Sequence, residues 1–168
     1  FEGTSSKKNC AYGGSIFFEI FSNTDVTFSN LNIIDSSSTN YGGGIGISCE
    51  NSGSTQLKVA FAFEHCLFKK CTSDYGGAIY MDENNKVDYE VSIKYCTFED
   101  CNSKEGSSIH CPPQKLELAH TIFSGSKSDS QDQASLIYID YKSEGPETKV
   151  TNCTFNDNNQ RIEFKLSN

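Results

Sequence analysis

Apolar and polar residues alternate along this chain in short runs, and each run changes phase once. In one copy the apolar positions are Val91, Ile93, Cys96, Phe98 and Cys101, and the two-residue alternation breaks between Ile93 and Cys96. Because successive side chains of a strand point to opposite faces, the pattern predicts two short strands joined at a bend. Four further copies lie at residues 26–36, 61–71, 116–126 and 148–158.

A second motif separates these copies at intervals of about 30 residues. It is clearest as Tyr75-Gly76-Gly77-Ala78-Ile79, with related copies at 12–16, 41–45 and 105–109 and weaker ones at 133–137 and 159–162. Apolar alternation resumes at its isoleucine, so the motif predicts a turn followed by a third strand. Three short strands cannot bury their apolar positions alone, but stacked repeats can.

We therefore predict an all-β fold, a right-handed parallel β-helix (solenoid) of about five to six three-stranded coils that occupies residues 1–168 as one domain. No segment holds the 3.6-residue apolar period of an amphipathic helix. The right hand follows from the usual hand of parallel crossovers. A β-sandwich is the competing fold, but its hairpins would not repeat the same residue types at matching positions.

Stacked coils place equivalent residues in rows that run along the rod. The paired glycines of each turn suit a corner that needs a positive φ or a close approach of neighbouring backbone. One predicted core row contains Ile33, Phe68, Phe98, Phe123 and Phe155. The other contains Phe18, Ile47, Met81, Cys111, Ile139 and Phe164.

Charge narrows the choice of partners. The chain has 14 basic and 22 acidic residues and a formal net charge of −8, the opposite of the basic surface that phosphate backbones and anionic lipids attract. We therefore expect no nucleic-acid partner. No apolar stretch approaches the roughly 20 residues that span a bilayer, so direct membrane insertion is not expected. The chain begins at Phe1 and ends in a strand-like segment, and we expect it to be a fragment of a longer protein.

The two motifs resemble those of the polymorphic outer membrane protein (Pmp-type) repeat family, which combines Gly-Gly-Ala-Ile with Phe-x-x-Asn. Residues 76–79 match the first motif in full and 155–158 match the second, whereas 68–71 and 98–101 end in Cys and 123–126 end in Ser. The resemblance covers most of the chain. It implies a right-handed parallel β-helix and a surface-exposed region used in adhesion, in bacteria and in some protozoan surface families.

Eight cysteines are present and none forms a Cys-x-x-Cys pair, which weakens zinc and thioredoxin-like interpretations. Cys66 and Cys96 share one row, and Cys71 and Cys101 share another. Adjacent coils lie about 4.8 Å apart, within the disulfide Cα window of roughly 4.4–6.8 Å. We predict disulfides Cys66–Cys96 and Cys71–Cys101. Reduced thiols packed as small hydrophobic side chains are the alternative.

The other cysteines carry weaker expectations. Cys153 lies two coils from Cys96 and should be free, and Cys111 should be a buried thiol. Whether Cys10 and Cys49 pair is left open. The sequence Asn152-Cys153-Thr154 is an acceptor for N-glycosylation, which makes Asn152 a candidate glycosylation site on the bend.

One row of outward residues at the bend is a candidate ligand-contact stripe, formed by His65, Tyr95 and His120. Its two histidines lie two coils apart, about 9.6 Å, too far to share a metal ion. His110 precedes the inward Cys111, so we expect it to face solvent and assign it no role.

No catalytic residue, cofactor or metal site is predicted. A glycosidase needs two facing carboxylates, and we expect no carboxylate cluster across coils. Lys69 should pair with Glu99, and Lys70 should lie between the acids of neighbouring coils, as ordinary cross-strand ion pairs.

These observations predict a non-catalytic surface or extracellular repeat module that binds a protein or glycan ligand or serves as a rigid spacer. Neighbouring domains would stack on the rod ends, whose exposed strands need a cover. Two alternatives stay open. One is a carbohydrate-active β-helix enzyme (a polysaccharide lyase or hydrolase) with carboxylates in segments 50–56 and 142–149. The other is an intracellular structural scaffold subunit.

Overall fold

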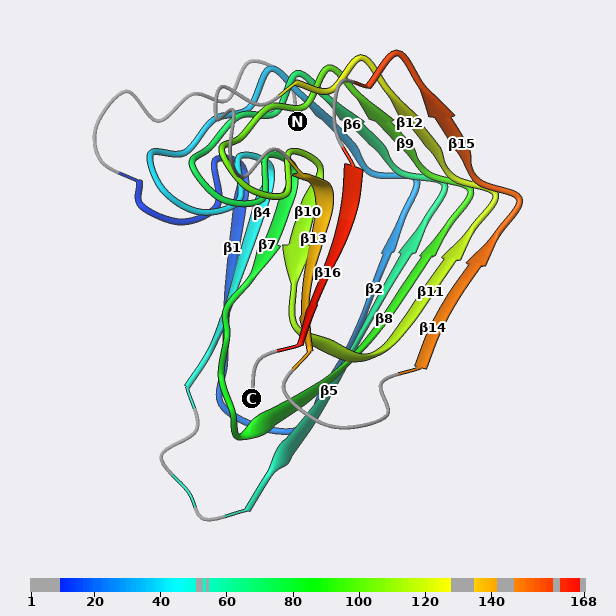
Figure 1. Ribbon diagram of the computed structural model, residues 1–168. Helices are drawn as coiled ribbons and strands as arrows, with labels where there is room; N and C mark the ends of the chain where they lie inside the picture. Colours follow the sequence, from blue (N-terminus) through cyan, green and yellow to red (C-terminus); the bar gives the residue numbers. More distant parts are fainter. Residues whose placement is uncertain are drawn as a thin grey trace.

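The computed structural model describes residues 10–50, 53, 55–127, 135–141, 147–158 and 161–166. Within these ranges the regular structure consists of strands arranged in three all-parallel sheets (Figure 1). The six-stranded sheet has the order β1-β4-β7-β10-β13-β16. Its strands are β1 (Ile16–Ile20), β4 (Ile45–Cys49), β7 (Ile79–Met81), β10 (Ile109–Cys111), β13 (Ser135–Tyr141) and β16 (Arg161–Leu166).

Two further sheets have five strands each, and we call them the long sheet and the short sheet. The long sheet contains β2 (Thr24–Ser29), β5 (Leu57–Glu64), β8 (Val87–Lys94), β11 (Pro113–Ala119) and β14 (Glu147–Thr151). The short sheet contains β3 (Asn32–Ile34), β6 (Leu67–Lys69), β9 (Thr97–Glu99), β12 (Ile122–Ser124) and β15 (Thr154–Asn156).

The chain visits the three sheets in a fixed order and returns to the first one coil further along. Each coil takes one strand from the six-stranded, the long and the short sheet, so the described residues form five coils and β16 begins another. In Figure 1 the colour accordingly changes in step from strand to strand within every sheet. This arrangement is a parallel β-helix and confirms the predicted fold class. None of the described segments is a helix of the length and apolarity that would cross a bilayer.

The phase change in the apolar pattern corresponds to a bend with a left-handed backbone. The residue between the long and the short strand of each coil has a φ between 51° and 56°, and a second such corner follows the short strand. Residues other than glycine rarely adopt this conformation. The first set contains Asn30, His65, Tyr95, His120 and Asn152. The second contains Asp35, Lys70, Asp100, Gly125 and Asp157.

The core consists of rows of like side chains, as predicted. The rings of Phe68, Phe98 and Phe123 are fully buried and stack with centroids 5.0 and 4.9 Å apart. Phe155 extends this row by a ring 5.2 Å from Phe123, and Ile33 pairs with Phe68 at the other end. Stacking of these rings buries a large apolar area in every coil.

The second predicted core row follows the six-stranded sheet. Backbone register pairs Phe18 with Ile47 and Ile47 with Met81, and β10 and β13 pair Cys111 with Ile139. Residue 164 continues this register from β16. The side chains of Ile47, Met81 and Cys111 are fully buried, so this row closes the core behind the glycine turns.

Candidate binding surface

The outward side chains of the long sheet form rows along the rod, because its strands pair in register and alternate side chains face outward. Two of these rows line a groove. We call them the Asp25 row and the Thr27 row. The Asp25 row consists of Asp25, Ala60, Glu90, Lys115 and Glu147. The Thr27 row consists of Thr27, Ala62, Ser92, Glu117 and Lys149.

A groove of about 270 Å³ opens where these rows cross β5. Its lining comes from four successive strands, β2, β5, β8 and β11. The groove exists because β5 contributes Ala60 and Ala62, whose side chains are single methyl groups. Ala60 lies between Asp25 and Glu90, and Ala62 lies between Thr27 and Ser92. A second depression of about 210 Å³ shares Glu90 and Lys115 with it and extends toward Lys58 and Asp88. The long sheet therefore presents a recess rather than a flat face.

Most charges near the groove are paired. Glu117 lies 2.8 Å from Lys94 Nζ and 3.7 Å from Lys149 Nζ, and the hydrogen bond from Lys94 lowers the pKa of the Glu117 carboxyl. Lys115 Nζ lies 3.7 Å from a carboxylate oxygen of Glu147. In the part of the chain that the structure describes, the carboxylates of Asp25 and Glu90 have no ion-pair or hydrogen-bond partner.

The acids Asp25 and Glu90 line the groove on either side of β5. Ala60 pairs with Asp25 on one side and with Glu90 on the other, so two acids face one groove from strands two steps apart. The sequence contained the signal. Val26, Phe61 and Val91 begin matching copies of the apolar pattern, and the residues before them in the chain are Asp25, Ala60 and Glu90.

The predicted contact stripe lies at the carboxyl-terminal edge of the long sheet. His65 stacks on Tyr95 at 5.0 Å and Tyr95 on His120 at 4.8 Å, with interplanar angles of 8° and 5°. The Tyr95 residue is 53% exposed. The left-handed corner turns each ring outward directly after the last residue of β5, β8 or β11. The three residues thus form an exposed ladder of rings beside the groove, and what it contacts stays a prediction.

Asn152 occupies the same corner one coil further along. Its φ is 51° and both it and Thr154 are exposed, so the acceptor sequence lies on the surface. The structure places this site where a glycan could be attached without disturbing the core, and its modification remains a prediction.

The expectation that His110 faces solvent was wrong. Only 3% of His110 is exposed, and its ring packs among tyrosines of the two neighbouring coils. The ring centroid lies 4.6 Å from that of Tyr138, 5.0 Å from Tyr80 and 6.0 Å from Tyr75. The side chain does point out of the sheet, but the turn that precedes each strand of the six-stranded sheet lies over it.

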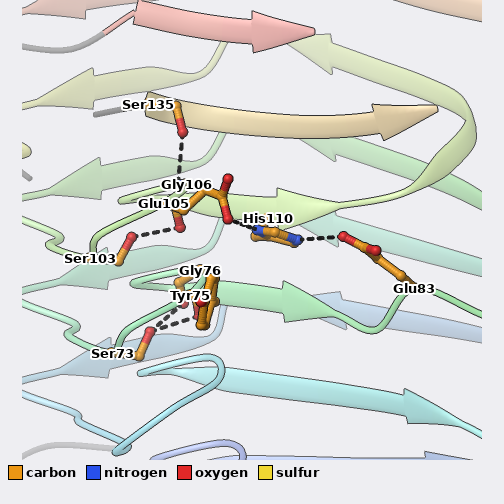
Figure 2. A network of polar contacts seen from close by, with 9 residues as sticks. All are labelled: Ser73, Tyr75, Gly76, Glu83, Ser103, Glu105, Gly106, His110 and Ser135. Atoms are coloured by element: carbon orange, nitrogen blue, oxygen red, sulfur yellow. Dashed lines mark hydrogen bonds and ion pairs between the residues drawn. The ribbon is translucent and has the colours of Figure 1, made fainter. Parts of the chain in front are cut away.

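Figure 2 shows His110 between two carboxylates, with Glu83 on one side and Glu105 on the other. Nε2 lies 3.4 Å from a Glu83 oxygen and Nδ1 lies 4.0 Å from a Glu105 oxygen. Nδ1 is buried and has no hydrogen-bond partner among the residues that the structure describes. This polar cluster lies under the turns and away from the groove, and we interpret it as part of the packing between turn and sheet.

Serine side chains hold these turns in place, as Figure 2 also shows. Ser73 Oγ donates to the carbonyls of Tyr75 and Gly76 at 2.8 and 3.0 Å, and Ser103 Oγ donates to the carbonyl of Glu105 at 2.7 Å. The glycine turn itself needs Gly76, because its φ is +62° and a Cβ there would overlap the Ile79 carbonyl. A repeated tyrosine immediately before the glycines was the signal for this outer aromatic layer.

The predicted disulfides are not confirmed. All eight cysteines lie in the described part of the chain and all are free thiols. The four thiols of the predicted pairs instead donate to carbonyls. Cys66 Sγ lies 3.4 Å from the carbonyl oxygens of Phe28 and Glu64. Cys101 makes the same pair of contacts at 3.6 Å with Phe68 and Glu99.

The physical reason is the direction of the side chains. The prediction considered only the distance between Cα atoms of Cys66 and Cys96. In-register parallel strands keep their Cα–Cβ vectors parallel, so the Cβ atoms stay about as far apart as the strands, 4.8 Å, beyond the 3.5–4.5 Å of a disulfide. The same argument applies to Cys71 and Cys101.

The environments of the thiols differ. A hydrogen bond with Cys96 lowers the pKa of Cys66 to about 7, and the same contact raises the pKa of Cys96. Burial raises the pKa of Cys111 to about 12 and that of Cys49 to about 11. Cys111 is buried, as predicted.

Lys69 Nζ lies 2.7 Å from Glu99 Oε1, which confirms that cross-strand pair. No group of three or more histidine, cysteine, aspartate or glutamate side chains in the described ranges is arranged to hold a metal ion. Glu50 is exposed and Glu147 lies in β14, whereas Glu144 lies outside the described residues.

Comparison with known proteins gives no assignment: no family model, no curated protein and no solved structure matches this chain.

Proposed function

We propose that the chain is a non-catalytic repeat module that binds a protein or glycan ligand through the outer face of the long sheet. The observation that carries this proposal is the groove that spans four coils beside the exposed rings of His65, Tyr95 and His120. Strands held in register on both sides keep such a surface in one conformation, so little conformational entropy is lost on binding. Solenoids commonly use extended surfaces of this kind for binding.

The proposed location is extracellular or at a cell surface, as the resemblance to Pmp-type repeats implies. The rod ends support contact with neighbouring domains as a second role. Strands β14 and β15 are sheet edges, and the core-row residues Val150 and Phe155 are 44% and 39% exposed there. An open edge with apolar side chains favours pairing with another strand. An intracellular structural assembly would use the same ends.

One observation favours a second candidate function, glycoside hydrolysis. Asp25 and Glu90 face one groove from strands two steps apart, about 9.6 Å between Cα atoms, near the 6.5–9.5 Å between carboxyl groups of inverting glycosidases. Such enzymes need the two acids in different environments, so that one is protonated and the other is not. Here both acids are exposed on the same sheet face, which favours binding over catalysis.

Binding and turnover can be separated in one experiment. The purified chain is applied to a glycan array and to a panel of immobilised extracellular proteins, and bound glycans are then analysed by mass spectrometry for cleavage. We expect saturable binding to one ligand class without products. Products that disappear in both Asp25→Asn and Glu90→Gln would contradict the proposal and establish the hydrolase.

A further inference from the structure

We propose that the groove accepts an arginine side chain of a protein partner, held between the carboxylates of Asp25 and Glu90 above Ala60. This inference rests on the proposed binding function and names the chemical class of its ligand. The residues of the Asp25 row belong neither to the predicted contact stripe nor to the two sequence motifs.

The geometry begins with the register of three strands. Ala60 pairs with Asp25 on β2 and with Glu90 on β8, so each acid lies one strand step, about 4.8 Å, from the alanine. The alanine methyl leaves the space between the two acids empty, and that space is part of the 270 Å³ groove. A group entering there meets a carboxylate on each side and an apolar floor below.

Asp25 and Glu90 line this space together with one cation, Lys115. Glu117 is paired with Lys94 and Lys149. Lys115 is the register neighbour of Glu90, but its Nζ lies 3.7 Å from a Glu147 oxygen on the opposite side. Within the described residues Asp25 and Glu90 have no such partner. The net charge of −8 adds a long-range attraction for cations. The complementary ligand is therefore cationic.

The spacing selects among cations. A guanidinium is planar and has five N–H donors directed to different edges, so one group can bridge two carboxylates. A lysine ammonium is compact and reaches one acid at a time. A calcium ion needs six to eight oxygens at about 2.3–2.6 Å, and two acids separated by two strand steps cannot supply them. The alkyl part of arginine would pack on Ala60 and Ala62, as long cationic side chains do on apolar surfaces.

The test is an NMR titration of the isotope-labelled chain at low ionic strength with the capped peptide acetyl-Gly-Ser-Arg-Ser-Gly-amide. The matched peptide carries citrulline, which has the shape of arginine without its charge. We expect saturable shifts in backbone amides of β2, β5 and β8 with the arginine peptide only. Asp25→Asn and Glu90→Gln should each raise Kd about three- to fivefold, the usual effect of an exposed ion pair.

Asp35→Asn is the control variant, because Asp35 is an exposed acid on the corner after the short strand β3 and its loss changes the net charge equally. Its Kd should equal that of the wild type. Equal binding of the citrulline peptide, an equal effect of Asp35→Asn, or the same shifts with calcium chloride alone would overturn the inference. If the arginine peptide fails but Ala60→Leu abolishes binding to an array ligand, the inference is wrong and the proposed function stands. If neither the peptide nor any array ligand binds, both are wrong.

Discussion

The close stacking of coils at the glycine turn can be tested by adding one methyl group at either of two adjacent residues. A Cβ at Gly43 would overlap the carbonyl oxygen of Gly77 in the next coil and lie 2.5 Å from both N and O of Thr72. All three atoms are backbone, so neighbouring coils must separate. A Cβ at Gly44 would lie 2.8 Å from the Ala78 carbonyl and 3.3 Å from the Phe68 ring. The equivalent residue of the next coil is Ala78, which already has a Cβ.

The two substitutions reduce the entropy of the unfolded chain equally, so their difference isolates the contact in the folded state. Overpacking costs about 1–3 kcal/mol, and we expect Gly43→Ala to lower the free energy of unfolding by about 3 kcal/mol, a drop in Tm of about 6–12 °C. Gly44→Ala should stay within about 1 kcal/mol of the wild type. Urea unfolding followed by circular dichroism measures both. Equal effects of the two variants would refute the stacking argument.

Three further predictions concern the core. Phe98→Ala should lower the free energy of unfolding by about 3–5 kcal/mol and the half-exposed Phe155→Ala by clearly less, as thermal unfolding would show; equal losses would contradict the ring ladder. Alkylation of the folded protein should label Cys10 and Cys153 before the six buried thiols; immediate labelling of all eight would contradict the burial. Since burial raises the pKa of Cys111 to about 12, its contribution to stability is complete below the unfolded thiol pKa and is lost as the pH rises from about 9 toward 12. Cys111→Val should therefore lose less stability than the wild type between pH 7.5 and 10.5, measured by urea unfolding.

The fold could be predicted because it depends on rows of inward residues, and periodic apolar patterns record which residues face inward. Phe68, Phe98 and Phe123 recur at matching positions, and only a stack of coils brings them together. The bend was predicted from the phase change, although its left-handed backbone at His65 and Tyr95 was not.

The surroundings of outward residues were harder to predict, because they depend on the conformation of turns. The apolar repeat does not indicate that conformation. His110 is outward yet buried, since the tyrosine turns cover the six-stranded sheet. The groove was not predicted because it results from two small residues, Ala60 and Ala62, among larger neighbours. An alanine carries no functional group that would indicate a site. The disulfide prediction was not confirmed because it used the distance between Cα atoms, which says nothing about the direction of the side chains.

The most direct test of the central claim, that the outer face of the long sheet binds the ligand, is to fill the groove. Ala62→Leu is compared with Thr97→Leu, an outward substitution on the short sheet in a row that already contains Leu67 and Ile122. Surface plasmon resonance with the ligand found on the array measures both variants. We predict that Ala62→Leu abolishes binding while Thr97→Leu leaves Kd unchanged. Unchanged binding by Ala62→Leu, or equal loss in both variants, would contradict the account.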